Sequence, residues 1–221
     1  MGGIFSYDSK LMQMLDTLGN TIMLTALFIL CCIPIITIGA AFTALFAACR
    51  AQTRGKGCFR AYFKAFKDNF LRATLLWVLF AALIYLCIGA AINLYQMDGS
   101  LAVFIMAVVG GSLLLTLLTM CLLFYSRFEC TFRQLIKNGV VMVLSFPVRS
   151  LLIALLSWLP VLGFFAYPDY VAALGIVWVT LYHGTAGAVC VWFMKRPFAR
   201  LAEKLLGVVE SDVIDEPAHG H

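Results

Sequence analysis

His183 is the ionisable side chain that lies deepest within an apolar stretch of this sequence, in the segment Tyr182-His183-Gly184-Thr185. An imidazole can act as a general base or as a metal ligand. A metal site would need further ligands, but no second histidine, cysteine or carboxylate stands within one helical turn of His183. A lone histidine beside small residues more often forms a hydrogen bond between helices. We therefore expect His183, and Asn93 in another apolar stretch, to be buried polar residues that are neither catalytic groups nor metal ligands.

The sequence contains no motif of a common catalytic or nucleotide-binding type. The segment Arg54-Gly55-Lys56-Gly57 lacks the spacing of a phosphate-binding loop, and no strand pattern precedes it. The motifs of serine hydrolases and zinc proteases are also missing. Carboxylates cluster in residues 206–221, a polar segment that we expect to be a disordered acidic tail. The sequence thus predicts a protein that is not an enzyme and that binds no cofactor.

The composition indicates that most of the chain is surrounded by lipid. Hydrophobic residues make up 63% of the 221 residues and charged residues only 12%, whereas soluble domains carry roughly 25% charged residues. A soluble protein of this size has too much surface relative to its volume to hide so many apolar side chains. We therefore expect an all-α, polytopic transmembrane helix bundle, formed as a single domain by residues 1–205.

Five apolar stretches have the length of a membrane span, which takes about 20 residues. They are residues 18–48, 73–95, 101–125, 150–166 and 171–194. The first is longer than one crossing requires, and Pro34 and Gly39 interrupt it. A proline removes a backbone donor from a helix, so we expect a helix break at these two residues. Two alternatives remain there: a single kinked span, or a re-entrant hairpin that folds back at Pro34.

The positions of the basic residues predict the orientation of the spans. All lysine and arginine residues except Lys10 fall in residues 50–72, 127–149 and 195–204. Basic residues accumulate on the cytoplasmic side of membrane proteins. Five spans would then place the C-terminus in the cytoplasm and the N-terminus outside. Because the basic segments flank apolar helices, we expect the lipid bilayer, and no nucleic acid, to be their partner.

Two of the basic segments also have the pattern of amphipathic helices. Phe59, Phe63, Phe66 and Phe70 stand at i, i+4, i+7 and i+11, which places them on one helical face. The segment around Phe132 repeats this pattern of apolar and basic residues. Such helices lie at the membrane interface, where basic side chains meet anionic headgroups; the alternative is a docking face for a cytoplasmic partner. The side chains expected to contact lipid or a partner are Arg60, Lys64, Lys67, Arg133 and Lys137.

Three stretches of the chain carry a resemblance to a known family. They are Phe5-Ser6-Tyr7-Asp8-Ser9, the stretch from Cys31 to Leu45 that includes Pro34 and Gly39, and Phe63-Lys64-Ala65-Phe66-Lys67-Asp68-Asn69-Phe70. They look like the YesL-like family of bacterial integral membrane proteins (domain of unknown function 624), with a likeness over residues 3–205. The resemblance implies a multi-pass protein of the bacterial cytoplasmic membrane and supplies no catalytic residues. Because members often occur beside genes for sugar ABC transporters and polysaccharide utilisation, it implies transporter or sensor subunits as partners.

Two functions are consistent with these features. The first is a non-enzymatic accessory component of a carbohydrate uptake or sensing system, which acts through helix packing and its basic cytoplasmic face. The alternative is a small-solute transporter or channel subunit, in which the broken first span at residues 34–39 lines the path. Small residues such as Gly184 and Ala188 allow close helix packing within one chain or between chains. The sequence therefore leaves the oligomeric state open.

Overall fold

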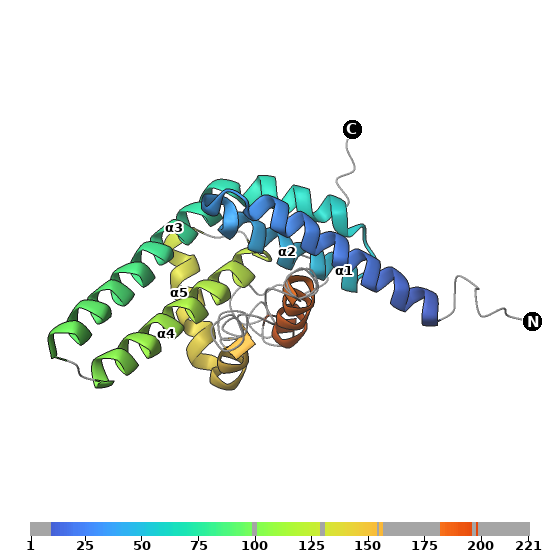
Figure 1. Ribbon diagram of the computed structural model, residues 1–221. Coiled ribbons are helices and arrows are strands. Elements are labelled where there is room, and N and C mark those ends of the chain that lie inside the picture. The colour runs from blue at the N-terminus through green and yellow to red at the C-terminus, as the bar shows by residue number, and fades with distance from the viewer. Residues whose placement is uncertain are drawn as a thin grey trace, which may run out of the picture.

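The described residues of the computed structural model form helices and the turns that connect them (Figure 1). They are residues 10–98, 101–128, 131–153, 155–156, 182–195 and 198. The helices are α1 (Lys10–Cys32), the short 3₁₀ helix η1 (Ile35–Thr37), α2 (Ile38–Thr53), α3 (Cys58–Asp98), α4 (Leu101–Tyr125) and α5 (Phe132–Ser145). Further helical segments occupy residues 147–153 and 182–195. The predicted fold class, an all-α helix bundle, is confirmed for this part of the chain.

Four helical stretches among the described residues are long and apolar enough to cross a membrane. They are Leu15–Cys32, Ile35–Thr53, Cys58–Ala90 and Ile105–Tyr125. A fifth results if α5 and Pro147–Ile153, which meet at a bend of 106°, are counted as one broken span. The span expected at residues 150–166 lies mostly outside the described residues, and that at 171–194 is described from residue 182 on. The tail at 206–221 lies wholly outside the described residues.

Of the two alternatives for residues 18–48, a single kinked span and a hairpin that folds back at Pro34, the structure has the hairpin, which consists of two antiparallel helices, α1 and α2. At the open end of the hairpin, the side-chain amide of Gln52 donates a hydrogen bond to the Thr17 carbonyl at 3.1 Å. Toward the closed end, the ring centroids of Phe28 and Phe42 lie 4.7 Å apart. The chain therefore folds back near Pro34, and the start of α1 lies at the same end of the hairpin as the end of α2 (Figure 1).

Side chains satisfy backbone carbonyls that the helix break exposes. The Thr37 hydroxyl lies 2.7 Å from the Pro34 carbonyl oxygen and 2.5 Å from that of Cys31. The indole Nε1 of Trp77, on α3, donates a hydrogen bond to the Ile35 carbonyl at 3.0 Å. An unpaired carbonyl is costly in lipid. These contacts therefore supply donors to carbonyls that have no partner within a helix.

The sequence suggested that Gly39 lies in the helix break. In the structure Gly39 lies in the first turn of α2. A Cβ atom on Gly39 would lie 2.3 Å from the Ala73 carbonyl oxygen and 2.6 Å from the Cβ of Trp77. The missing side chain thus lets α2 approach α3 closely. The break itself lies between Cys32 and Ile38, with Pro34 inside it.

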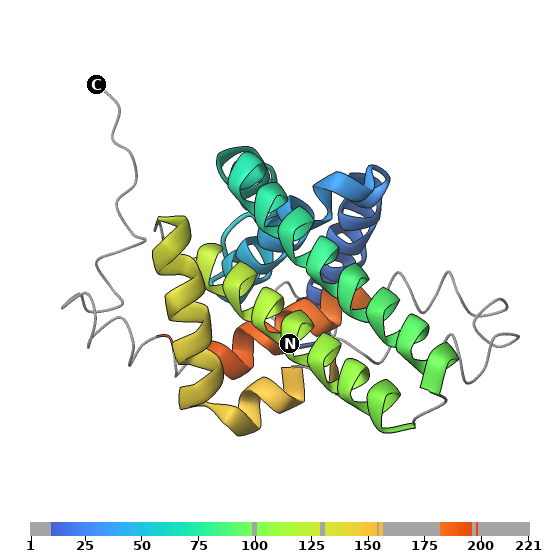
Figure 2. The ribbon, with the colours of Figure 1, turned by 90° about the vertical axis from the view of Figure 1, so that its left-hand side faces the viewer.

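Residues 58–98 form one continuous helix, α3, although the sequence suggested an interfacial helix followed by a separate span. At about 1.5 Å per residue α3 is roughly 60 Å long, whereas a bilayer with its headgroups is about 40–45 Å thick. The first half of α3 packs along α2, where Cys58 and Tyr62 join the buried side chains of the α1–α2 hairpin. The second half extends away from the hairpin and pairs with α4 (Figures 1 and 2). The two halves of α3 therefore have different surroundings.

The helical segment 182–195 packs against the α1–α2 hairpin through small residues. A Cβ atom on Gly184 would lie 2.5 Å from the hydroxyl oxygen of Thr25, on α1. The thiol sulfur of Cys49, on α2, lies 3.8 Å from the Gly184 carbonyl oxygen. Close approach of helix backbones at small residues is the usual way in which helices pack in lipid. Gly184 therefore acts in packing within the chain.

The helix α5 packs on α4 and ends where Pro147 follows. Its first turn has a capping box, in which the Gln134 side chain accepts a hydrogen bond from the Thr131 backbone N–H at 3.1 Å. A Cβ atom on Gly139 would lie 2.4 Å from the sulfur of Cys121 on α4, so the two helices are in close contact. The residue before a proline avoids the helical conformation. This explains why α5 ends and bends there, whereas α3, which has no proline, continues.

Candidate functional site

A basic cleft of about 710 Å³ lies where the end of α2, the first half of α3 and the end of α4 meet. Its volume is within the range of small-molecule sites, about 300–1,000 Å³. Among its described lining residues Asp68 is the sole carboxylate. The basic residues that line it are Arg50, Arg54, Lys56, Lys64, Arg72 and Arg127. The cleft therefore carries a large excess of positive charge.

A well-defined turn at the end of α2 holds two of these cations, Arg54 and Lys56. The Lys56 N–H donates to the Ala51 carbonyl and the Gly55 N–H donates to the Gln52 carbonyl, both at 3.0 Å. This pair of hydrogen bonds is the Schellman motif, which requires a left-handed residue directly after the helix cap. Gly55 has that conformation, with φ of +68°. The glycine of the basic segment thus shapes a helix terminus and does not form a phosphate-binding loop.

One face of α3 supplies the opposite wall of the cleft. Lys64, Asp68 and Arg72 follow one another at intervals of four residues, so they lie on the same side of the helix. Ala61 and Ala65 line the cleft between them. Their small side chains leave space beside the charged groups.

Arg50 connects the cleft to α4. Its guanidinium donates hydrogen bonds to the hydroxyl of Ser126, at 3.4 Å, and to the Ser126 backbone carbonyl. Ser126 directly follows α4, so Arg50 caps the C-terminal end of that helix, where cations are favourable. A guanidinium has five N–H donors. Because these two hydrogen bonds use only part of them, Arg50 keeps donors for a further acceptor.

Arg127 lies beside Arg50 and has aromatic support. Its guanidinium carbon lies 5.4 Å from the ring centroids of both Phe128 and Phe198. Arg50, Arg54 and Arg127 also line a smaller, adjoining hollow together with Lys195. Cations thus lie side by side at the end of the molecule where α2 and α4 end.

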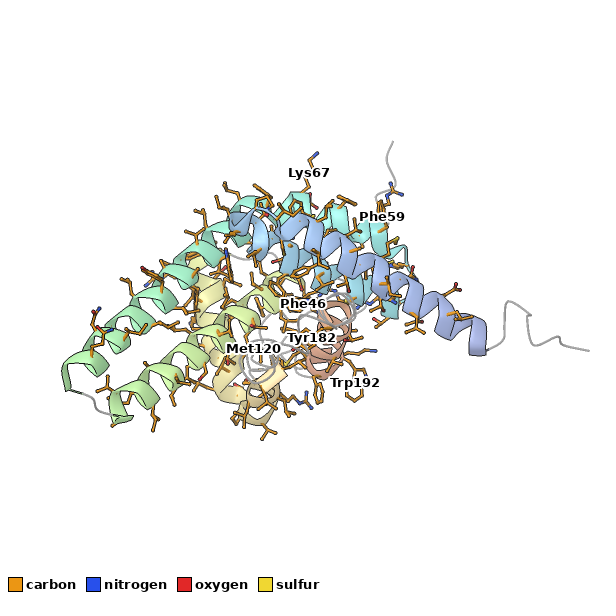
Figure 3. All side chains as sticks on the ribbon, viewed as in Figure 1. Phe46, Phe59, Lys67, Met120, Tyr182 and Trp192 are labelled. Carbon is orange, nitrogen blue, oxygen red and sulfur yellow. The ribbon has the colours of Figure 1, made fainter. Side chains whose placement is uncertain are left out.

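The structure separates the five basic residues that the sequence singled out. Lys64 lines the basic cleft, whereas Arg60 and Lys67 are exposed on an adjacent side of α3, and Lys67 points away from the bundle (Figure 3). Arg133 and Lys137 are exposed on α5. These residues therefore occupy two different helices and do not form one site.

Three of the four phenylalanines in the row on α3 are surface residues, whereas Phe66 is half-buried and packs against the core. Phe59 is 49% exposed, and Phe63 and Phe70 are also exposed. The buried face of this half of α3 contains Cys58 and Tyr62 instead. We call the exposed side of the helix, formed by Phe59, Arg60, Phe63, Lys67 and Phe70, the outer face of α3. Its combination of aromatic rings and cations is typical of helices at a membrane interface.

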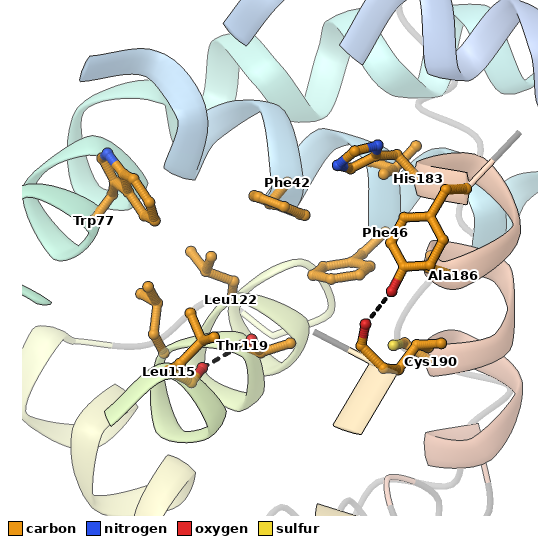
Figure 4. A pocket seen from close by; sticks show the side chains of 14 residues that line it. Phe42, Phe46, Trp77, Leu115, Thr119, Leu122, His183, Ala186 and Cys190 are labelled. Atoms are coloured by element: carbon orange, nitrogen blue, oxygen red, sulfur yellow. Dashed lines mark hydrogen bonds between the residues drawn. The ribbon is translucent and has the colours of Figure 1, made fainter. Parts of the chain in front are cut away.

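A second hollow, of about 120 Å³, lies inside the bundle and is mainly apolar (Figure 4). His183 lines it and is half-buried, with its ring stacked on Phe28 at a centroid distance of 4.9 Å. The Tyr182 hydroxyl donates a hydrogen bond to the Leu156 carbonyl. Among the described residues, no three His, Cys, Asp or Glu side chains are grouped so that they could hold a metal ion. His183 thus lies in an apolar hollow.

Asn93 is not buried, contrary to expectation. It is exposed on the second half of α3, and its side-chain amide donates a hydrogen bond to the Gly89 carbonyl one turn earlier, at 2.9 Å. This local hydrogen bond satisfies part of the amide without a partner helix.

Arg50 and Ser126, in contrast, form the central contact of the cleft and were not singled out from the sequence. The two residues are 76 positions apart, and no local pattern links them.

These features define the class of the protein: an all-helical polytopic membrane protein with a basic cleft at one end of its bundle. Residues 21–89 match the model of a family described as "Protein of unknown function, DUF624". This match confirms the resemblance to the YesL-like family over the second half of α1, α2 and most of α3. No curated protein and no solved structure matches the chain. The matched stretch contains the α1–α2 hairpin from residue 21 onward and five of the six cationic residues of the cleft, all except Arg127.

Proposed function

We propose that the protein is a non-enzymatic accessory component of a carbohydrate uptake or sensing system, and that it docks on its partners through the outer face of α3. The observation that carries this proposal is the exposure of cations and aromatic rings together on that face. Cations steer the encounter with acidic surfaces, and aromatic side chains supply contact area. The proposed association with a carbohydrate system rests on the family resemblance alone.

The orientation in the membrane follows from the same basic residues. The positive-inside rule assigns the end of the bundle that carries the cleft to the cytoplasm. The start of α1 lies at this end of the hairpin, because Thr17 contacts Gln52. The earlier expectation of an N-terminus outside the cell assumed one span at residues 18–48. With a hairpin in that place, we propose a cytoplasmic location for the start of α1.

The docking proposal is tested by crosslinking in native membranes, followed by affinity capture and mass spectrometry. The unchanged protein should capture subunits of a sugar transporter or of a sensor. The variant Arg60→Glu/Lys67→Glu should lose most of that capture, because it reverses the charge of the outer face. The matched control is Arg60→Lys/Lys67→Arg, which keeps the charge and should keep the capture. Recovery of the protein alone, or equal capture by both variants, would contradict the proposal.

The alternative function, passage of a small solute, has weaker support. The apolar hollow of about 120 Å³ is small and has few polar groups to replace the water around a sugar. The helix break does not line it: Ile33 and Ile35, at the closed end of the α1–α2 hairpin, are each 72% exposed. Uptake of labelled sugars into proteoliposomes that contain only this protein would establish the alternative, and we expect no flux above that of empty liposomes.

A further inference from the structure

We infer that the basic cleft is a binding site for a phosphate group, carried by an anionic lipid headgroup or by a small soluble phosphate ester. This goes beyond docking on a partner protein, because the cleft is distinct from the outer face of α3. Six cationic side chains and one carboxylate line its described walls. Like charges held this close repel one another, so an anion between them is stabilising.

The chemistry of the cleft favours phosphate over a single carboxylate. Arginine presents a planar fork of donors that matches phosphate oxygens, and lysine adds a mobile point charge. Arg50, Arg72 and Lys64 reach the cleft from two different helices. A phosphate offers several acceptor oxygens, so donors from different directions can bind it together. A carboxylate has only two oxygens and would engage fewer of them.

Arg50 is placed as the anchor of this site. It is half-buried, and among the described residues its hydrogen bonds go to Ser126 alone. Those two contacts fix the guanidinium plane and leave other N–H donors for the ligand. Arg54, Lys56 and Arg127 have further contacts of their own and contribute charge at the rim.

Helix capping alone does not explain the cleft. Capping of α4 accounts for Arg50, and the turn after α2 accounts for the position of Arg54. Lys64 and Arg72, however, lie six and fourteen residues after the first residue of α3, beyond its first turn, and cap no helix. Their presence on the wall opposite Arg50 is explained by a shared anionic ligand.

The space in the cleft indicates what the phosphate is attached to. At about 710 Å³ the cleft is much larger than one phosphate group. Alanine side chains from α2 and α3, at Ala47, Ala51, Ala61 and Ala65, line it beside the cations. A glycerol or similar small polyol fits beside such walls. Both sources of phosphate, a phospholipid headgroup and a soluble phosphate ester, have this chemistry.

The test uses the purified full chain and two double variants of equal charge. Lys64→Ala/Arg72→Ala removes two cations from the cleft wall and keeps the Arg50–Ser126 contact. The control, Arg60→Ala/Lys67→Ala, removes two cations from the outer face of the same helix. All four residues are exposed, so both variants should fold; thermal unfolding in detergent checks this. Lys64→Arg, which retains the charge, serves as a rescue variant.

Binding is measured in two arms. Native mass spectrometry compares retention of phosphatidylglycerol with that of phosphatidylcholine, and calorimetry in phosphatidylcholine nanodiscs measures binding of glycerol 3-phosphate. The cleft variant should lose roughly tenfold or more in affinity, as expected for removal of charge-assisted hydrogen bonds, and the control variant should lose less than about twofold. A loss in the first arm assigns the lipid headgroup, and a loss in the second assigns a soluble ester. If neither probe binds, or if both variants lose affinity equally, the proposal of a phosphate site is wrong. This holds whatever the result of the partner-capture experiment that tests the docking proposal.

Discussion

Arg50, in the last turn of α2, donates hydrogen bonds to both the hydroxyl and the backbone carbonyl of Ser126, the residue that follows α4. This contact joins the α1–α2 hairpin to the pair formed by α4 and the second half of α3. It also fixes one guanidinium at the floor of the basic cleft. The same side chain therefore links the stability of the bundle to the site proposed for phosphate.

Replacement of Arg50 by alanine should destabilise the protein. The Ser126 carbonyl would lose its donor, at a cost of about 1–3 kcal/mol for a partly buried group. Repulsion between Arg50 and its basic neighbours acts in the opposite direction, but salt screens it. The loss should therefore be clearest in thermal unfolding at high salt in detergent. Lys64→Ala, which removes a cation from the same cleft without breaking a described hydrogen bond, should leave the midpoint unchanged; equal midpoints for both variants would contradict the capping role.

Gly39→Ala should be strongly destabilising, because the new Cβ would lie 2.3 Å from the Ala73 carbonyl oxygen. Overpacking of this kind costs about 1–3 kcal/mol or more, since backbone atoms must move. Gly19→Ala on α1 is the matched control, because nothing lies within 4 Å of its added Cβ. Alanine is the better helix former by about 1 kcal/mol, so Gly19→Ala should hold or raise the unfolding midpoint. The close packing of α2 on α3 would be refuted if the two variants behaved alike.

Gly55→Ala should weaken the turn that holds Arg54 and Lys56. Its φ of +68° costs a residue with a side chain about 1–2 kcal/mol. Gly57→Ala in the same turn meets no atom within 4 Å and has no positive φ, so it is the control. A lower unfolding midpoint for Gly55→Ala alone is the expected result. If calorimetry also shows weaker glycerol 3-phosphate binding for that variant alone, the turn contributes to the cleft.

The fold class was predictable from the sequence because it depends on local properties. Long apolar stretches and few charges indicate helices in lipid, and the structure has four such helices among its described residues. The continuity of α3 could also have been predicted, since no proline or glycine stands between residues 58 and 88. The change from charged to apolar residues at Arg72, which suggested a separate span at 73–95, does not interrupt the helix.

The hairpin and the cleft depend on contacts between distant segments, which local patterns do not reveal. Pro34 predicts a break, but a kinked span and a hairpin share that break. The contact of Thr17 with Gln52, 35 residues apart, distinguishes the two. The basic clusters around residues 50–72 and 127–149 were recognised from the sequence, but the packing of α2 against α4 decides which of their members face one another.

The most direct test of the account is a distance measurement between residues 17 and 52 in intact membranes. The variant Thr17→Cys/Gln52→Cys is treated with a short bifunctional maleimide, and the linked peptides are identified by mass spectrometry, which separates them from links to native cysteines. The hairpin places these residues in contact and predicts an abundant 17–52 link within one chain. A single kinked span would hold them on opposite sides of the membrane, roughly 50 Å apart at about 1.5 Å per residue. The hairpin would be contradicted if the link were absent and single cysteines at 17 and 52 were labelled from opposite sides of the membrane. That result would also contradict the proposed cytoplasmic location of the basic cleft.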